Sequence, residues 1–164
     1  MRLLYPGEGK TCLHAPMIRR RRDTDLDACV AVLAQVHTHS GYPHHWPDDP
    51  PRWLTPAGLS AAWVAEADGR IVGHAALCGS EVSRLYVAPA ARGLGLGLRL
   101  LRTVEEEAAA RGLNPVLEVQ STNTDAIALY ERRGWVRRRT EQQDWGRGAV
   151  VTVHHYEAVA RSAH

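Results

Sequence analysis

The most informative stretch of this chain is residues 84–97, which read RLYVAPAARGLGLG. An apolar strand pattern over Leu85–Val87 is followed by a proline, and then by a glycine-rich turn that leads into a helical pattern. The first N–H groups of a helix lack intrahelical acceptors, and the helix dipole favours negative charge beside them. Glycine lets the backbone approach a phosphate closely. The stretch therefore predicts a phosphate-binding loop at a helix N-terminus.

The glycine spacing argues against two common nucleotide loops. The dinucleotide fingerprint G-x-G-x-x-G fails because Leu98 stands where its third glycine would fall. A Walker loop needs Gly-Lys followed by Ser or Thr, and Lys10 is the only lysine in the chain. What remains is R-x-x-G-x-G, with Arg92, Gly95 and Gly97 as its fixed positions. A glycine-rich turn without a ligand is the alternative interpretation.

A second motif lies at residues 117–135, which read LEVQSTNTDAIALYERRGW. Together the two motifs resemble the Gcn5-related N-acetyltransferase (GNAT) family. The second motif fits the family pattern L-x-V-x-x-x-N-x-x-A-x-x-L-Y-x-x-x-G-F at every fixed position except the last, where Trp135 replaces phenylalanine. The resemblance covers about residues 18–158.

Periodicity and turn signals predict alternating strands and helices. A strand begins at residue 17, and Asp23 or Thr24 is expected to cap the first helix. A long loop rich in proline and aromatic residues follows, over residues 38–58, and such a loop is usually functional. The expected elements after residue 20 are helices over 24–39, 96–111 and 123–133, and strands over 61–67, 70–78, 81–87, 115–119, 135–140 and 150–158. The dipeptide Asp68–Gly69 is expected to form a type I′ hairpin turn. In the helix over 96–111, Leu98 is expected on the apolar face and Glu105–Glu107 toward solvent.

This order fits several α/β folds. The resemblance narrows it to the acyl-CoA N-acyltransferase fold: a mixed α/β protein with a mostly antiparallel central sheet, a splayed parallel strand pair, and helices on both faces. We expect one domain over residues 17–160. Residues 1–16 show no periodicity and are expected to form a flexible extension.

The resemblance implies a coenzyme A site. In the family the pantetheine arm lies between two splayed parallel strands, and a main-chain N–H near Val87 would face the thioester carbonyl. Asn123 is expected to cap a helix and to contact the pantetheine arm. Tyr130, whose ordinary pKa of about 10 is close to that of a thiol, would protonate the leaving sulfur. The residues expected to bind acetyl-CoA are Leu85, Tyr86, Val87, Arg92, Gly93, Leu94, Gly95, Leu96, Gly97, Asn123 and Tyr130.

Two glutamates are candidates for the general base. Glu81 lies eleven residues before Arg92, where Gcn5-type histone acetyltransferases carry their catalytic glutamate. Glu118 lies twelve residues before Tyr130, where the enzymes that acetylate ribosomal-protein N-termini carry theirs. The residues do not choose between them, and a solvated strand position is the alternative for each.

The resemblance implies that the loop over residues 38–58 covers the acceptor site. Its aromatic and histidine residues Tyr42, His45, Trp46 and Trp53 are candidates for binding the substrate, with Asp48 and Asp49 as partners for a cation. We expect a small-molecule primary amine as the acceptor. A peptide N-terminus, or an acyl-CoA-binding module without turnover, are the alternatives.

Composition limits the remaining functions. The chain has 164 residues and a formal net charge of +2, which gives no strong field for nucleic acid. The run Arg19–Arg22 is expected to be a solvated edge strand. No apolar stretch reaches the roughly 20 residues of a membrane span, and the histidine pairs lack zinc-site spacing, so we expect no membrane and no metal. A cytoplasmic enzyme, either monomer or homodimer, fits these features.

Overall fold

The computed structural model describes residues 15–159. The expectation for the first sixteen residues falls almost wholly outside this range. The elements in chain order are β1 (Met17–Arg20), the 3₁₀ turn η1 (Asp23–Asp25), α1 (Leu26–Ser40), α2 (Pro50–Trp53), β2 (Leu59–Ala67), β3 (Arg70–Cys78), β4 (Glu81–Val87), η2 (Pro89–Ala91), α3 (Leu96–Ala110), β5 (Val116–Gln120), α4 (Thr124–Arg132), β6 (Val136–Asp144) and β7 (Val150–Glu157).

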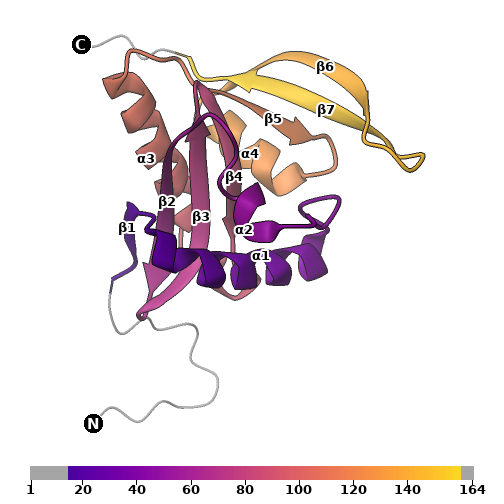
Figure 1. Ribbon diagram of the computed structural model, residues 1–164. Coiled ribbons are helices and arrows are strands. Elements are labelled where there is room, and N and C mark those ends of the chain that lie inside the picture. The colour runs from indigo at the N-terminus through magenta and orange to yellow at the C-terminus, as the bar shows by residue number, and fades with distance from the viewer. Residues whose placement is uncertain (1–14, 160–164) are drawn as a thin grey trace.

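The strands form one seven-stranded sheet in the order β1-β2-β3-β4-β5-β7-β6. Every neighbouring pair is antiparallel except β4 and β5, which are parallel. Helices cover both faces (Figure 1). Gly73 on β3 lies against Leu100 of α3, whereas Tyr86 beside it donates a hydrogen bond to the Cys29 carbonyl on α1, on the opposite face. The predicted mixed fold is confirmed.

The hairpin between β2 and β3 turns at Asp68 and Gly69, as predicted. Both residues have positive φ, at 52° and 74°, as a type I′ turn requires. Around this turn the strands pair from Leu59–Cys78 to Ala67–Arg70. The hairpin therefore places β3 beside β2, in a register fixed by a local turn.

The parallel pair β4–β5 is joined at one register position only, Glu81 with Val116. Beyond this point the two strands diverge, and β5 continues with β7 as its other neighbour (Figure 1). On its other side, β4 carries a bulge against β3: His74 pairs with Tyr86, but Ala76 pairs with Ser83. β4 thus has one extra residue there, which bends the strand away from a regular ladder.

Some side chains differ from the expected faces. Leu98 was expected on the buried face of α3 but is 38% exposed, because the buried stripe runs through Leu96, Leu100, Leu101, Val104 and Ala108. The glutamates of this helix, expected in solvent, are partly engaged; Glu105 binds Arg133, and Glu107 binds Arg20 and Arg111. Among the described residues, no helix is both long and apolar enough to cross a membrane.

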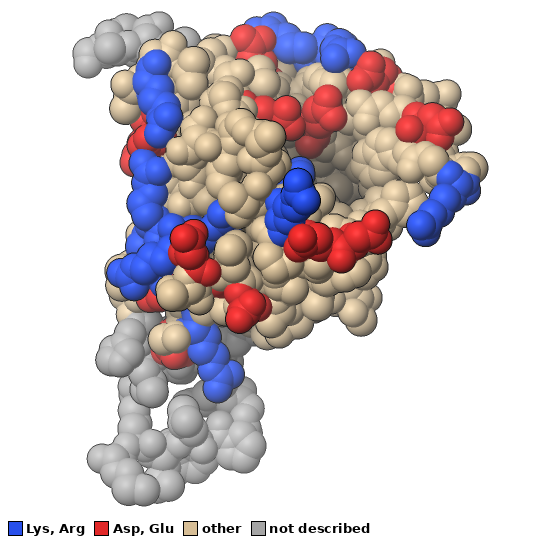
Figure 2. All heavy atoms as spheres, in the orientation of Figure 1, with Lys and Arg blue, Asp and Glu red and all other residues tan. Residues whose placement is uncertain are grey.

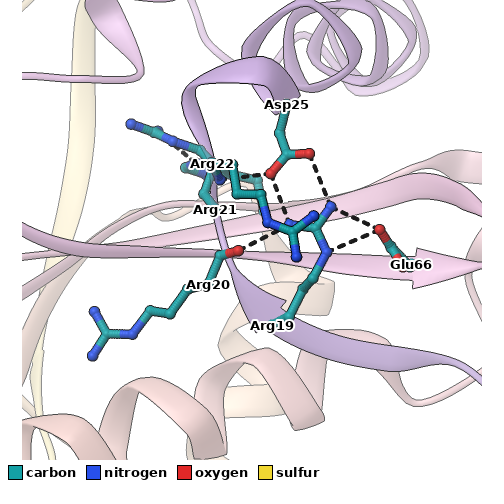
Figure 3. Close-up of polar contacts among 7 residues, drawn as sticks. Arg19, Arg20, Arg21, Arg22, Asp25 and Glu66 are labelled. Atoms are coloured by element: carbon teal, nitrogen blue, oxygen red, sulfur yellow. Dashed lines mark hydrogen bonds and ion pairs between the residues drawn. The ribbon is translucent and has the colours of Figure 1, made fainter.

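The arginine run is only partly solvated, which corrects the expectation of a solvated edge strand. β1 is an edge strand, but Arg19 bonds both oxygens of Asp25, at 2.8 and 2.9 Å, and also Oε1 of Glu66 (Figure 3). The hydrogen bonds that Asp25 accepts from Arg19 are the main reason why the pKa of Asp25 is lowered to about 2. Asp25 also accepts a 2.6 Å hydrogen bond from the N–H of Arg22. Asp25, and neither Asp23 nor Thr24, therefore organises the start of the first helical segment.

Candidate active site

The glycine loop joins β4 to α3 through η2. Gly93 and Gly95 have φ of 86° and 72°, a region that residues with a Cβ rarely adopt, so these turns require glycine. α3 begins directly after Gly95. At Gly97 an added Cβ would lie 3.5 Å from Cδ2 of Leu129 and 4.0 Å from Cγ2 of Val87. The N-terminus of α3 therefore lies close to both the end of β4 and α4.

The main chain of β4 offers a hydrogen-bond donor toward the gap between β4 and β5. The N–H of Ala88 donates to the Val72 carbonyl on β3 at 2.7 Å. Since successive N–H groups of a strand point to opposite sides, the N–H of Val87 points toward β5. There the pairing with β5 has already ended, because Glu81 with Val116 is the one registered pair. This geometry fits an extended ligand arm placed between the strands.

Two residues expected to bind acetyl-CoA are committed to the core. Tyr86 is buried, and its ring stacks on His74 with 5.3 Å between the ring centroids. Its hydroxyl donates a hydrogen bond to the carbonyl oxygen of Cys29. Leu96 is fully buried in the core beneath α3. For both residues only the main chain faces the loop. The side chains of Leu85, Val87 and Leu94 are half-buried, and Arg92 is exposed at the loop's outer end.

The second motif forms β5 and α4, and it carries two more of the expected residues. The side chain of Asn123 accepts a 3.3 Å hydrogen bond from the N–H of Ala126, so it caps α4 as predicted. Tyr130 is 7% exposed, and its ring lies 6.0 Å from that of Trp135 and 6.1 Å from that of Tyr156. Burial, together with the nearby Tyr42 hydroxyl, raises the pKa of Tyr130 above its ordinary value. Tyr130 therefore keeps its proton at neutral pH.

Glu81 and Glu118 lie on the same face of the sheet, opposite α4. Glu81 pairs with Cys78 at the start of β4. Burial raises the pKa of Glu81, and the negative charge of Glu118 raises it further. Glu118 is 45% exposed, and one of its oxygens lies 3.4 Å from Nδ1 of His155. The structure thus brings both candidate bases into one electrostatically coupled group.

His155 links this group to the outer strand. Its Nε2 lies 2.8 Å from Oε1 of Glu141 on β6. Ligand atoms of Glu118, Glu141 and His155 all lie within 4.8 Å of one another, close enough to meet at a cation. The Glu141 carboxylate already accepts hydrogen bonds from Arg139 and Gln143, at 2.7 and 2.8 Å. That occupancy favours an ion-paired network over a metal centre, and the absence of a metal stays a prediction.

The expected acceptor residues divide into two groups. Tyr42 and Trp53 are partly buried, and their rings lie 6.2 Å apart in an edge arrangement, with Tyr86 behind Tyr42 at 6.4 Å. They form an aromatic wall at the base of the loop. Trp46 is 39% exposed and packs against His37 at 5.4 Å, away from that wall. Asp49 caps α2 by accepting from the N–H of Arg52.

The α1–α2 loop reaches across to the turn between β6 and β7. Nε2 of His45 lies 3.0 Å from the carbonyl oxygen of Trp145, and the His44 ring lies 5.3 Å from the Trp145 ring. Figure 2 shows this face hollowed between the α1–α2 segment and β6–β7, with both acidic and basic side chains at its edge. The contact closes the hollow on its outer side. The sequence patterns did not single out Trp145, because its partners lie one hundred residues away.

The fold is that of acyl-CoA N-acyltransferases, with a parallel pair that splays, a glycine loop at a helix N-terminus, and an amide facing the gap. The sequence matches the acetyltransferase (GNAT) family over residues 28–135. The chain belongs to that family.

Two curated relatives show the range of functions around this chain. An IAA acetyltransferase from Azospirillum brasilense is 39% identical over 82 residues, which are 46% of this chain and 54% of the relative. A mycothiol acetyltransferase from Thermomonospora curvata is 40% identical over 92 residues, 52% of this chain and 30% of the relative. The chain thus spans about half, or less, of the length of these relatives.

The likeness to solved structures covers a larger share of this chain than the likeness to the curated relatives. A ribosomal-protein-alanine N-acetyltransferase from Brucella melitensis superimposes with a TM-score of 0.70 at 26% identity, covering 88% of this chain and 99% of that one. An acetyltransferase from Salmonella typhimurium, solved with its cofactor acetyl-CoA, gives 0.65 at 23% identity, covering 92% and 98%. The second likeness bears on the fold alone.

Proposed function

We propose that this protein is a cytoplasmic N-acetyltransferase that takes its acetyl group from acetyl-CoA and transfers it to the primary amine of a small molecule, within a ternary complex. The observation that carries the proposal is the opening between β4 and β5. The strands are joined only at Glu81 with Val116, and the glycine loop and Tyr130 lie at the open end.

The donor would be held mainly by main-chain groups. The residues from Arg92 to Gly97 present the first N–H groups of α3, which suit a pyrophosphate because the helix dipole and the orphan donors favour negative charge. Gly97 leaves space beside Val87 and Leu129 for close approach. Acetyl-CoA supplies an acetyl thioester, which is activated toward attack by an amine.

Three groups of this chain would assist the transfer. The N–H of Val87 points into the gap and would donate to an oxygen that gains negative charge during the transfer. Tyr130 keeps its proton at neutral pH and would give it to the departing sulfur. Its raised pKa makes it a weaker acid than a free tyrosine, so the transfer depends on close placement of the sulfur. A carboxylate on the opposite face would accept the proton of the incoming ammonium, directly or through water.

We assign the base to Glu81 in preference to Glu118. A useful general base has a pKa near the working pH, and burial and Glu118 both raise the pKa of Glu81. Both glutamates are exposed, and Glu118 lies 3.4 Å from Nδ1 of His155. In this proposal Glu118 tunes Glu81 and contributes negative charge to the acceptor side.

A small cationic acceptor fits the hollow better than a folded protein does. Tyr42 supplies an aromatic wall, with Trp53 beside it under the Arg84 guanidinium. Glu81, Glu118 and Glu141 supply negative charge. The contact of His44 and His45 with Trp145 restricts access from the outer side. The relatives are named for different acceptors, so their names do not select one.

A peptide N-terminus is the second candidate acceptor. Its support is the likeness to the ribosomal-protein-alanine N-acetyltransferase and the presence of Glu118 and Tyr130 in one site. A thin extended chain can pass where a folded surface cannot. A panel containing both amines and short peptides would separate the two candidates.

The proposal is tested first by binding and then by turnover. Acetyl-CoA at about one hundred times its dissociation constant should stabilise the protein by roughly 2.7 kcal/mol, which raises the melting temperature by several degrees, whereas NAD and ATP should not. Thiol release is then followed over the panel, with Tyr130→Phe expected to lower kcat about 10- to 100-fold and to leave the KM for acetyl-CoA nearly unchanged. No stabilisation by acetyl-CoA, or a larger one by NAD, would refute the proposal.

A further inference from the structure

Arg21 turns inward from the arginine run and joins three elements. Its Nη1 donates to the Leu54 carbonyl at 2.6 Å and contacts Nε2 of His74 at 3.0 Å. Its Nη2 donates to Oγ1 of Thr55 at 2.8 Å. The guanidinium therefore ties the residues that follow α2 to β3, in the middle of the sheet.

His74 continues this connection to β4. It is completely buried, and its Nδ1 lies 2.8 Å from the carbonyl oxygen of Arg84. A guanidinium can only donate, so Nε2 of His74 must accept from Arg21, and Nδ1 must carry the proton that goes to Arg84. Both contacts are satisfied by a single neutral tautomer, whose orientation is fixed from both sides.

Arg84 is the residue that needs such support. It has a φ of 53° in the bulge of β4, a conformation that costs free energy for any residue with a Cβ. Its guanidinium lies 4.0 Å from the centre of the Trp53 ring, and its Nε donates to the Trp53 carbonyl at 3.2 Å. Trp53 ends α2, and Leu54 follows it. The contacts thus form a closed ring: Arg21, His74, Arg84, Trp53–Leu54, and back to Arg21.

This ring connects the two halves of the site. The bulge at Arg84 lies three residues before Val87, whose N–H faces the gap, so the bulge sets where that donor points. Trp53, at the other end of the ring, belongs to the aromatic wall on the acceptor side. We propose that His74 is a positioning residue: its hydrogen bond to the Arg84 carbonyl holds the β4 bulge and so aims the Val87 N–H at the reacting carbonyl, while Arg21 orients the His74 ring. This role rests on the proposed acetyl transfer.

Two substitutions at His74 separate its two hydrogen bonds. In His74→Asn the side-chain amide nitrogen takes the place of Nδ1 and can still donate to Arg84. In His74→Gln the amide reaches the place of Nε2 and can still accept from Arg21, but the donor to Arg84 is lost. We expect His74→Gln to lower kcat about 10- to 100-fold, with the KM for acetyl-CoA within about threefold of wild type, because a displaced donor affects the transition state most. His74→Asn should restore most of the lost kcat.

The matched control is His154→Asn. His154 is a second buried histidine, held by Oγ1 of Thr140 at 2.7 Å on the other face of the sheet. It should change the melting temperature without separating kcat from KM. Equal loss of kcat in His74→Asn and His74→Gln, or no loss in either, would overturn the positioning role.

Hydrogen exchange provides a readout that does not depend on turnover. Peptides covering residues 84–88 and 50–55 should exchange faster in His74→Gln than in wild type, and at nearly the wild-type rate over residues 84–88 in His74→Asn. If wild type fails to bind acetyl-CoA, the proposed function fails, and the exchange pattern still tests the ring. Equal exchange in all three proteins would show that His74 does not hold the bulge, whatever the protein catalyses.

Discussion

Nε1 of Trp135 donates a 3.2 Å hydrogen bond to Oε1 of Glu105, and so joins the end of α4 to the middle of α3. The same carboxylate receives Nε of Arg133 at 2.8 and 3.1 Å. Phenylalanine, the residue that the family motif leads one to expect at position 135, has no N–H for this bond. The departure from the motif is therefore matched by a partner on a different helix.

Trp135→Phe should destabilise the protein. It removes the donor to Glu105 and part of a buried ring, and we expect the free energy of unfolding to fall by about 1–2 kcal/mol. Denaturant unfolding of Trp135→Phe, Glu105→Ala and the double variant measures the coupling. If the two single effects simply add, the hydrogen bond contributes nothing beyond ring packing.

Gly97 should control donor binding without controlling folding. An added Cβ meets Leu129 and Val87 only at ordinary contact distance, so Gly97→Ala should fold normally. In Gly97→Leu the longer side chain extends into the gap, and we expect the dissociation constant for acetyl-CoA to rise at least about tenfold. Calorimetric titration measures this, with Leu98→Ala, at the exposed neighbouring position, as the control. Unchanged affinity in Gly97→Leu would place the donor elsewhere.

The pH profile distinguishes the two candidate bases. If Glu81 is the base, Glu118→Gln removes a negative charge that raises the pKa of Glu81, so the acid limb of kcat/KM should move to lower pH while activity persists. Glu81→Gln should lower kcat about 10- to 100-fold. The reverse pattern, with activity lost in Glu118→Gln and kept in Glu81→Gln, would make Glu118 the base.

His74 should make the fold sensitive to mild acid. Burial, opposed by its bond to the Arg84 carbonyl, lowers the pKa of His74 from 6.5 to about 4, and the guanidinium groups of Arg21 and Arg84 add to the lowering. Tyr86, stacked on the ring, stays neutral because burial raises its pKa. In the unfolded chain the His74 side chain binds a proton near pH 6.5, whereas in the folded chain it does so only near pH 4. The stability that this group contributes is therefore complete above pH 6.5 and is lost as the pH falls toward 4.

The measurement compares wild type with His74→Asn in urea between pH 7 and pH 4. Wild type should lose up to about 3 kcal/mol more than the variant over this interval, since one pKa unit corresponds to about 1.4 kcal/mol. Parallel curves for the two proteins would mean that His74 titrates normally in the fold.

The parts of the fold that could be predicted from sequence are those with local causes. The strand over residues 81–87 was predicted to the residue, because it is bounded by turns on both sides, and the Asp68–Gly69 turn followed from its own dipeptide. Asn123 was correctly predicted as a helix cap for the same reason. The splay of the parallel pair was predicted from the resemblance to a family, and not from periodicity or turn signals.

The parts that escaped prediction depend on contacts between distant segments. Nothing near Arg21 in the sequence shows that it points inward to His74, 53 residues away, while Arg19 pairs with Asp25 and Glu66. β6 extends four residues past its predicted end because it pairs with β7 up to Asp144 and Val150. Periodicity finds which face of a strand is apolar, but it does not find the partner across the sheet.

The contact between the α1–α2 loop and the β6–β7 turn has a practical meaning for engineering. The two segments lie about one hundred residues apart in the sequence and contact each other in the fold. His45 binds the main-chain carbonyl of Trp145, so this contact does not depend on the side chain at position 145. Shortening or exchanging one segment alone would leave the other without its support. Libraries that aim to change the proposed acceptor range should therefore vary residues 41–49 and 144–150 together, because the width of the hollow depends on both loops.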